Sequence, residues 1–224
     1  MESASRRYEW AGSNYFQGAP MAGKYAVLVD GGFIKKKLQE RHKHFPTVAE
    51  IQTEVDRIKA HDLLRAFVLL RVYFYDAPPA SGVITNPLDG KRTDLSATAS
   101  HASNTSLQQT LEMQADFALR SGETAVHGWS LGSMALKSLM KKARPLVAND
   151  LVPDIEQKGV DLRIGLDIAR LSLRQLVDII VVVTGDSDMV PAFKFARREG
   201  VRVYLDHMGH GVRRELKAHA DVVL

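Results

Sequence analysis

Two short runs of consecutive apolar residues dominate the hydrophobic pattern of the chain. Residues 25–29 read Y-A-V-L-V and residues 179–183 read I-I-V-V-V. The first run is followed by D-G-G and the second by T-G-D-S-D. Short β-branched runs closed by glycine are typical of parallel strands that are buried on both faces. The pattern therefore predicts two central strands, each ending beside aspartate.

The other elements follow from the spacing of apolar residues and from turn signals. Thr47, with Glu50 three positions on, is a capping box and predicts a second helix from that point. Residues 76–106 are poor in large apolar groups and predict a long, flexible loop. Helices are further expected at 33–41, 107–119 and 189–200, and strands at 69–75, 125–131 and 201–205.

Residues 160–177 carry two apolar patterns. Strict alternation from residue 160 to residue 168 would by itself indicate a strand. A second set of residues recurs at steps of four and three through the whole segment, which predicts a helix. Its expected apolar face consists of Leu162, Leu166, Ala169, Leu173 and Leu176.

Composition narrows the class of protein. The 224 residues, 45% of them hydrophobic, are enough for one sizeable core. The alternation of expected strands and helices predicts a three-layer α/β/α sandwich around a mainly parallel sheet. The sequence has no cysteine, no leader and no apolar run near the roughly 20 residues that span a bilayer, so we expect a cytoplasmic location. The net charge of +4 favours a polyanionic partner. Residues 14–18 resemble the end of an engineered protease-cleavage site, so we expect residues 1–20 to be an expression-tag remnant and residues 21–224 to be one domain.

Aspartates follow both predicted central strands. Asp30 ends the first strand, and Asp186 and Asp188 follow the second. Ligands of an open α/β sheet bind beyond the carboxyl ends of its strands, so these acids are expected to share one crevice. Carboxylates a few ångströms apart repel by roughly 4 kcal/mol per pair at an effective dielectric near 20. A divalent cation held by oxygen ligands, Mg²⁺ or Mn²⁺, explains such a cluster.

Two more aspartates lie on the predicted helix at 160–177. Asp161 is at its start, where it either enters the crevice or caps the helix. Asp167 lies roughly 120° further around the axis, where pairing with Arg163 and Arg170 is the simpler explanation. Asp188 has a capping alternative as well, because a helix follows it.

An ordered set of motifs resembles a known family. V-D-G-G-F at 29–33, Y-F-Y-D-A-P-P at 73–79, K-G-V-D at 158–161 and T-G-D-S-D-M-V-P at 184–191 together resemble NYN domains, and look most like the bacterial LabA-like branch of the PIN-like nucleases. The resemblance implies a PIN-like fold and metal-dependent hydrolysis of RNA. It also implies a site made of Asp30, Asp161, Asp186 and Asp188, with support for Asp167 and for Thr184 as a residue that orients a carboxylate or water.

The sequence also suggests which residues contact RNA, and it leaves two rival functions to be considered. Basic residues close to the first aspartate, expected to contact single-stranded RNA, are Lys35, Lys36, Lys37 and Arg41. One rival is a binding module of the same fold with little or no activity. Another is a haloacid-dehalogenase-like phosphohydrolase, although Gly32 stands where that class needs a second aspartate. Self-association into a homo-oligomer is compatible with the sequence.

Overall fold

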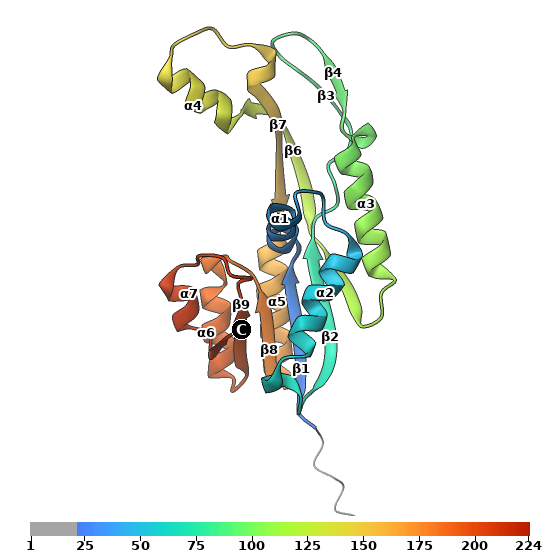
Figure 1. The fold of residues 1–224 in the computed structure, drawn as a ribbon, viewed down its shortest axis with the longest axis vertical. Helices are drawn as coiled ribbons and strands as arrows, with labels where there is room; N and C mark the ends of the chain where they lie inside the picture. Colours follow the sequence, from blue (N-terminus) through green and yellow to red (C-terminus); the bar gives the residue numbers. More distant parts are fainter. Residues whose placement is uncertain (1–21) are drawn as a thin grey trace, which may run out of the picture.

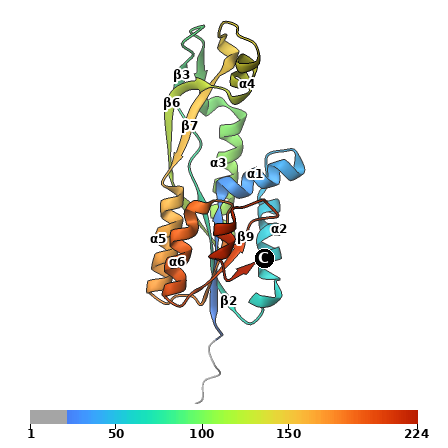
Figure 2. The same ribbon diagram turned by 90° about the vertical axis from the view of Figure 1, so that its left-hand side faces the viewer.

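The computed structural model describes residues 22–224, and the expected tag remnant lies outside them. Six parallel strands form the central sheet in the order β10-β9-β8-β1-β2-β5. Helices cover both faces, which confirms the predicted three-layer α/β/α architecture (Figures 1 and 2). The strands are β1 (Lys24–Asp30), β2 (Val68–Asp76), β5 (Phe117–Ser121), β8 (Ile179–Val183), β9 (Arg202–Asp206) and β10 (Val222–Val223).

Successive residues of β1 point into two different cores. Ala26 and Leu28 pack in the core formed with α5 (Val160–Leu173), α6 (Val190–Arg198) and α7 (Arg214–Ala218). Val27 and Val29 pack in the core formed with α1 (Gly31–His42), α2 (Val48–Lys59) and α3 (Ala99–Glu112). All four side chains are fully buried, as expected for a parallel strand covered on both faces.

The order of the strands places a topological switch point between β1 and β8, and we call the region beyond the carboxyl ends of these two strands the crevice. The chain leaves β1 into α1 on one face of the sheet, whereas it leaves β8 through a short 3-10 turn (Ser187–Met189) into α6 on the other face. Ligands of doubly wound sheets bind where the connections diverge in this way, at the carboxyl ends of the strands.

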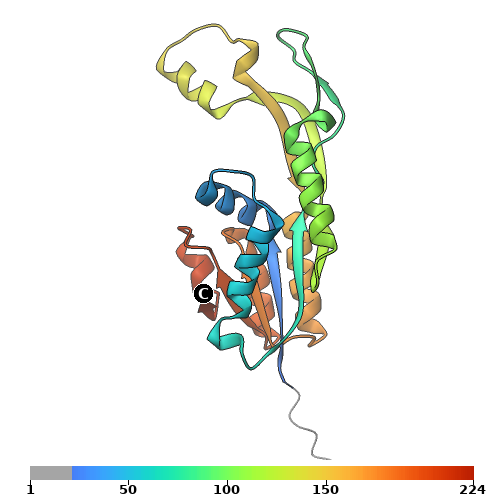
Figure 3. The same ribbon diagram turned by 45° about the vertical axis from the view of Figure 1, so that its right-hand side comes forward.

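An antiparallel ribbon extends beyond the carboxyl edge of the sheet (Figures 1 and 3). It consists of β6 (Glu123–Leu131) and β7 (Leu151–Lys158), which carry α4 (Ser133–Lys141) at their far end. We call these elements the arm. β7 leads directly into α5 through Gly159, whose φ of 70° lies in the left-handed region that glycine adopts without strain.

Three expectations are corrected by the fold. Residues 76–106, expected to be a loop, contain the hairpin strands β3 (Val83–Thr85) and β4 (Arg92–Asp94) and the first half of α3. The helix expected over residues 107–119 ends at Glu112, and Phe117 begins β5. The first segment has few large apolar residues and so shows little periodicity, whereas in the second the apolar residues continue from α3 into β5, so their spacing does not mark the end of the helix.

The third correction concerns the face of α5. The helix exists as predicted, but its buried positions are Val160, Ile164, Ile168 and Leu171. The leucines of the expected apolar face are exposed instead, at 66% for Leu162, 60% for Leu166 and 61% for Leu173. Because the helix carries two apolar stripes, its sequence could not decide which stripe packs on the sheet.

Candidate functional site

Acids on both sides of the crevice are neutralised by basic partners. Asp76 ends β2 with a fully buried side chain, and its Oδ2 lies 2.6 Å from Lys35 Nζ. Asp206 ends β9 with a side chain that is 2% exposed, and it pairs with Arg57. These two carboxylates have a structural role, because removing either partner of the pair would leave an uncompensated buried charge and destabilise the protein.

The four aspartates predicted for the site lie between these pairs. Within residues 22–224, none of them forms an ion pair. Their charges nonetheless act on one another. Burial raises the pKa of Asp30 and of Asp161, and in addition Asp161 and Asp186 raise that of Asp30, while Asp186 and Asp188 raise that of Asp161. The crevice therefore gathers negative charge from three elements: Asp30 from β1, Asp161 from α5, and Asp186 and Asp188 from the turn after β8.

Asp30 is half-buried at the end of β1. Its side chain caps α1 by accepting a hydrogen bond from the Phe33 backbone N–H at 3.0 Å. Burial raises the pKa of Asp30 from 3.8 to about 6, and the nearby carboxylates add to this, whereas the hydrogen bonds from Phe33 and Thr184 oppose it. A carboxylate with two neutral donors and no cation is thus held at the centre of the crevice.

Thr184 connects the two strand ends. Its side chain is fully buried, and its Oγ1 donates to Asp30 Oδ2 at 3.3 Å. The same oxygen accepts a hydrogen bond from the Asp186 backbone N–H at 3.1 Å. The hydroxyl therefore orients both the carboxylate of β1 and the turn that presents the other aspartates.

Of the remaining acids, Asp186 caps a turn and Asp161 does not cap a helix. Asp186 caps the short turn after β8 by accepting from the Asp188 backbone N–H at 2.9 Å. The N-cap of α5 is Gly159, so Asp161 lies inside the first turn and does not cap the helix. Burial raises the pKa of Asp161, followed by the charges of Asp186 and Asp188. Asp161 is thus close enough to Asp186 and Asp188 for their charges to act on it.

Asp167 lies in a different network. Its Oδ2 accepts from Tyr75 Oη at 2.9 Å and from Arg120 Nε at 3.0 Å, and its Oδ1 lies 3.2 Å from Arg170 Nε. The expected pairing with Arg170 is present, whereas the Arg163 guanidinium donates to the Gly159 carbonyl at 3.0 Å instead.

Three of the four basic residues expected to contact RNA are engaged within the protein. Lys35 holds Asp76, Lys37 pairs with Glu40 and lies 3.2 Å from His210 Nδ1, and Arg41 pairs with Glu54. Lys36 is exposed and forms no ion pair within the described residues. Of this group, Lys36 is thus the residue whose charge is available to a ligand.

A pocket of about 320 Å³ lies between the arm and α3, and none of the four aspartates lines it. Gln157 lines this pocket and also lies close to Asp30. A methyl group built on Gly32 would lie 3.6 Å from Gln157 Oε1 and 3.4 Å from Asp30 Oδ1, so Gly32 separates the two side chains. No lining residue carries a full charge, and the lining includes Pro78, Pro79, Ser100, His101, Asn104 and Gln157. A neutral group fits this lining better than a phosphate does.

Sequence reasoning did not place Asp76 or Gln157 near the site. Asp76 could have been found, because it directly follows a predicted strand just as Asp30 does. Gln157 donates to Asp76 Oδ1 at 3.3 Å from the end of β7, and nothing in its local sequence indicates this position. Gln157 lies near the crevice because β7, the strand of the arm that contains it, ends there.

The four aspartates and Thr184 form an all-oxygen donor set that suits Mg²⁺ or Mn²⁺. No three of these carboxylates bring their oxygens within 4.8 Å of one another, since within residues 22–224 that spacing occurs in one group alone, His42, His44 and Glu50. Mg²⁺ ordinarily binds through one or two carboxylates and keeps several waters, so this wider spacing remains compatible with it.

A family model described as the NYN domain matches residues 130–224. This segment is less than half of the chain and contains Asp161, Asp167, Asp186 and Asp188, whereas Asp30 precedes it. None of the curated proteins matches the chain. Among solved structures, a protein of unknown function from Vibrio parahaemolyticus is 13% identical with a TM-score of 0.50, and the match covers 92% of this chain and 94% of that chain. That likeness shows a shared fold alone. Within the described residues, no helix combines the length and apolarity needed to cross a membrane.

Proposed function

We propose that this protein is a cytoplasmic, Mg²⁺- or Mn²⁺-dependent ribonuclease of the NYN type, similar to the LabA-like branch, that hydrolyses phosphodiester bonds of single-stranded RNA. One observation carries the proposal: four aspartates share a crevice and have no cationic partner within residues 22–224, whereas Asp76 and Asp206 on either side are paired with Lys35 and Arg57. The NYN match over residues 130–224 supports a nuclease, because NYN domains are part of the PIN-like nuclease group.

The proposed roles follow from position. Asp30, Asp186 and Asp188 hold the metal, and Thr184 orients Asp30. When bound, Mg²⁺ or Mn²⁺ would neutralise the carboxylates and polarise the scissile phosphate. Asp161, in the first turn of α5, contributes to the same metal-binding group and is the carboxylate best placed to orient or deprotonate the attacking water.

The surroundings support a single-stranded substrate. The uncharged pocket beside Gln157 would accept one unpaired base, which a duplex cannot offer without unstacking it. Lys36 is available for backbone phosphates near Asp30. Further exposed lysines without ion pairs in the described part of the chain lie on or next to α4, at the end of the arm: Lys137, Lys141 and Lys142. We infer that RNA passes between the arm and the crevice.

Asp167 has a supporting role in this proposal. It holds the end of β2 to α5 through Tyr75, and Arg120 and Arg170 neutralise it. Its substitution is therefore expected to affect folding stability more than chemistry.

A nuclease assay on purified protein tests the proposal. RNA and DNA oligonucleotides, single- and double-stranded, are incubated with Mg²⁺, Mn²⁺ or chelator, with the Asp186→Asn variant as the control for contaminating nucleases. We expect cleavage of single-stranded RNA that requires metal and is lost in the variant. Tight, salt-dependent RNA binding without cleavage by the wild type would assign the chain to the binding-module alternative.

Light scattering of the same sample tests self-association, for which the exposed leucines of α5 offer an apolar face.

A further inference from the structure

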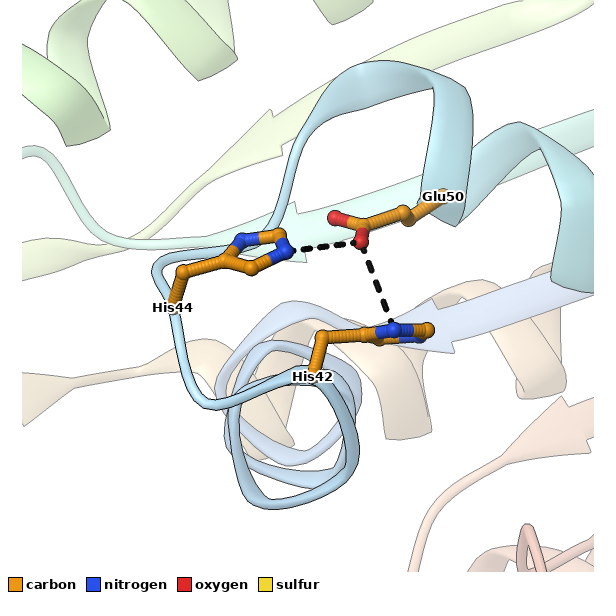
Figure 4. A group of neighbouring side chains, drawn as sticks. All are labelled: His42, His44 and Glu50. Atoms are coloured by element: carbon orange, nitrogen blue, oxygen red, sulfur yellow. Dashed lines mark ion pairs between the residues drawn. The ribbon is translucent and has the colours of Figure 1, made fainter.

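His42, His44 and Glu50 converge at the connection between α1 and α2 (Figure 4). His44 Nε2 lies 3.3 Å and His42 Nδ1 lies 3.7 Å from the same carboxylate oxygen, Glu50 Oε1. The turn between the helices creates this arrangement, because Lys43 ends α1 with a φ of 63° and so brings the residues on either side of it together. The group is entirely local, spanning nine residues from 42 to 50.

The imidazole of His44 faces an oxygen acceptor on each side. Its Nδ1 lies 2.9 Å from the Phe45 carbonyl oxygen, and its Nε2 faces Glu50 Oε1. A neutral imidazole has one N–H, so it can satisfy one of these acceptors and must direct a lone pair at the other. Either protonation of the ring or a metal cation between Nε2 and Glu50 removes that conflict, and donation from Nδ1–H to a carbonyl is the usual way in which a metal-ligating histidine is oriented.

Glu50 is held in place independently of the histidines. Its other oxygen, Oε2, accepts from the Thr47 backbone N–H at 2.7 Å and from Thr47 Oγ1 at 3.0 Å, as in a capping box. The hydrogen bond from the Thr47 backbone lowers the pKa of Glu50. Oε1 is therefore an ionised, oriented donor with one side directed at the two rings.

We propose that His42, His44 and Glu50 form a Zn²⁺ site with solvent at the remaining position. Tetrahedral zinc with bonds of about 2.0–2.2 Å places neighbouring ligand atoms roughly 3.3–3.5 Å apart, and the carboxylate-to-nitrogen distances here are 3.3 and 3.7 Å. Two imidazoles and one carboxylate select zinc or a similar transition ion over Mg²⁺, which prefers oxygen alone. The site is distinct from the aspartate crevice in donor chemistry, and it fixes the end of α1 to the start of α2.

Zinc titration of the full chain, after chelator treatment and in excess Mg²⁺, tests the site. We expect one Zn²⁺ per chain by competition with a chromophoric chelator, and tetrahedral visible bands when Co²⁺ replaces Zn²⁺. Glu50→Gln and His44→Ala should each weaken zinc binding by at least about tenfold. Glu50→Gln is informative because glutamine keeps the capping box, so α2 retains its cap while the ligand is lost.

His127→Ala is the matched control. This exposed histidine also pairs with a glutamate, at 3.0 Å from Glu156, but within residues 22–224 the pair has no third metal-ligating side chain beside it. The control and Asp186→Asn should bind zinc as the wild type does. Equal zinc affinity in the wild type, Glu50→Gln and His44→Ala would overturn the proposal, as would loss of binding in Asp186→Asn, which would place the ion among the aspartates. Failure of the nuclease assay would leave this result unaffected, since the readout is metal binding.

Discussion

Thr184 Oγ1 donates a hydrogen bond to Asp30 Oδ2 at 3.3 Å across 154 positions of sequence. The bond joins the carboxyl ends of β8 and β1, the two strands that border the crevice. A hydroxyl stabilises the carboxylate without neutralising it, in contrast to Lys35 at Asp76 and Arg57 at Asp206. Asp30 therefore keeps its charge available to a cation, and the cost of that charge is measurable in metal-free protein.

The first prediction concerns stability and pH. Burial raises the pKa of Asp30 to about 6 in the folded protein, above the ordinary value of 3.8. The folded state thus binds this proton more tightly, and the resulting stabilisation is present below about pH 4 and lost as pH rises through about 6. In metal-free protein at pH 8, Asp30→Asn should raise the free energy of unfolding by as much as about 3 kcal/mol. The gain should shrink towards zero near pH 4.

Chemical unfolding in the presence of chelator measures this difference at both pH values. Asp76→Asn is the control, because Asp76 has a cationic partner and its substitution should destabilise the protein at pH 8. Equal stability of Asp30→Asn and the wild type at pH 8 would show that the Asp30 carboxylate is not strained in the folded state.

The second prediction separates Asp161 from Asp167. Asp161→Asn should reduce cleavage of single-stranded RNA by about 10²-fold or more, the scale of a lost acid–base or water-positioning group. Asp167→Asn should cost less than about tenfold in cleavage, because its carboxylate contacts Tyr75, Arg120 and Arg170 rather than the crevice. Rates at saturating metal, together with melting temperatures, check both variants. Similar large losses of rate in two well-folded variants would place Asp167 in the catalytic group.

The third prediction distinguishes neighbouring lysines. Lys36→Ala should lower the salt dependence of RNA binding by about 0.7 in the log–log slope while the fold is unchanged, because one phosphate contact is lost. Lys35→Ala should destabilise the protein by about 3 kcal/mol, because it leaves the buried Asp76 carboxylate without its cation. Anisotropy titrations at several salt concentrations and unfolding curves measure the two effects. An unchanged slope in Lys36→Ala would assign that residue to ordinary solvated surface.

The fourth prediction concerns the pocket beside Gln157. Ser100 is exposed on its wall, in the first turn of α3, so Ser100→Trp should fill the pocket without disturbing the core. We expect at least about a tenfold loss of affinity for single-stranded RNA, within the range measured for one stacked base. Ser106→Trp, on the same helix outside the pocket lining, is the control. Equal RNA affinity of the two variants would exclude a base in this pocket.

Local sequence determined the strands and the helix caps. The buried runs of β1 and β8 and the capping box of Thr47 with Glu50 lie where their residues predict them, because each depends on neighbours within a few positions. The prediction that Asp30 and Asp186 approach one another also came from sequence, since parallel strands end at one edge of a sheet. The electrostatic coupling of these two aspartates agrees with it.

Tertiary structure decided which charges are neutralised and which apolar face is buried. Asp76 and Asp30 both end parallel strands, yet Lys35 reaches Asp76 alone, because the side chains of α1 have fixed directions over the sheet. Likewise, α5 presents two apolar stripes, and the sheet covers the one with Ile164 and Ile168. Such choices depend on contacts between residues far apart in the chain, and local periodicity is the same for either outcome.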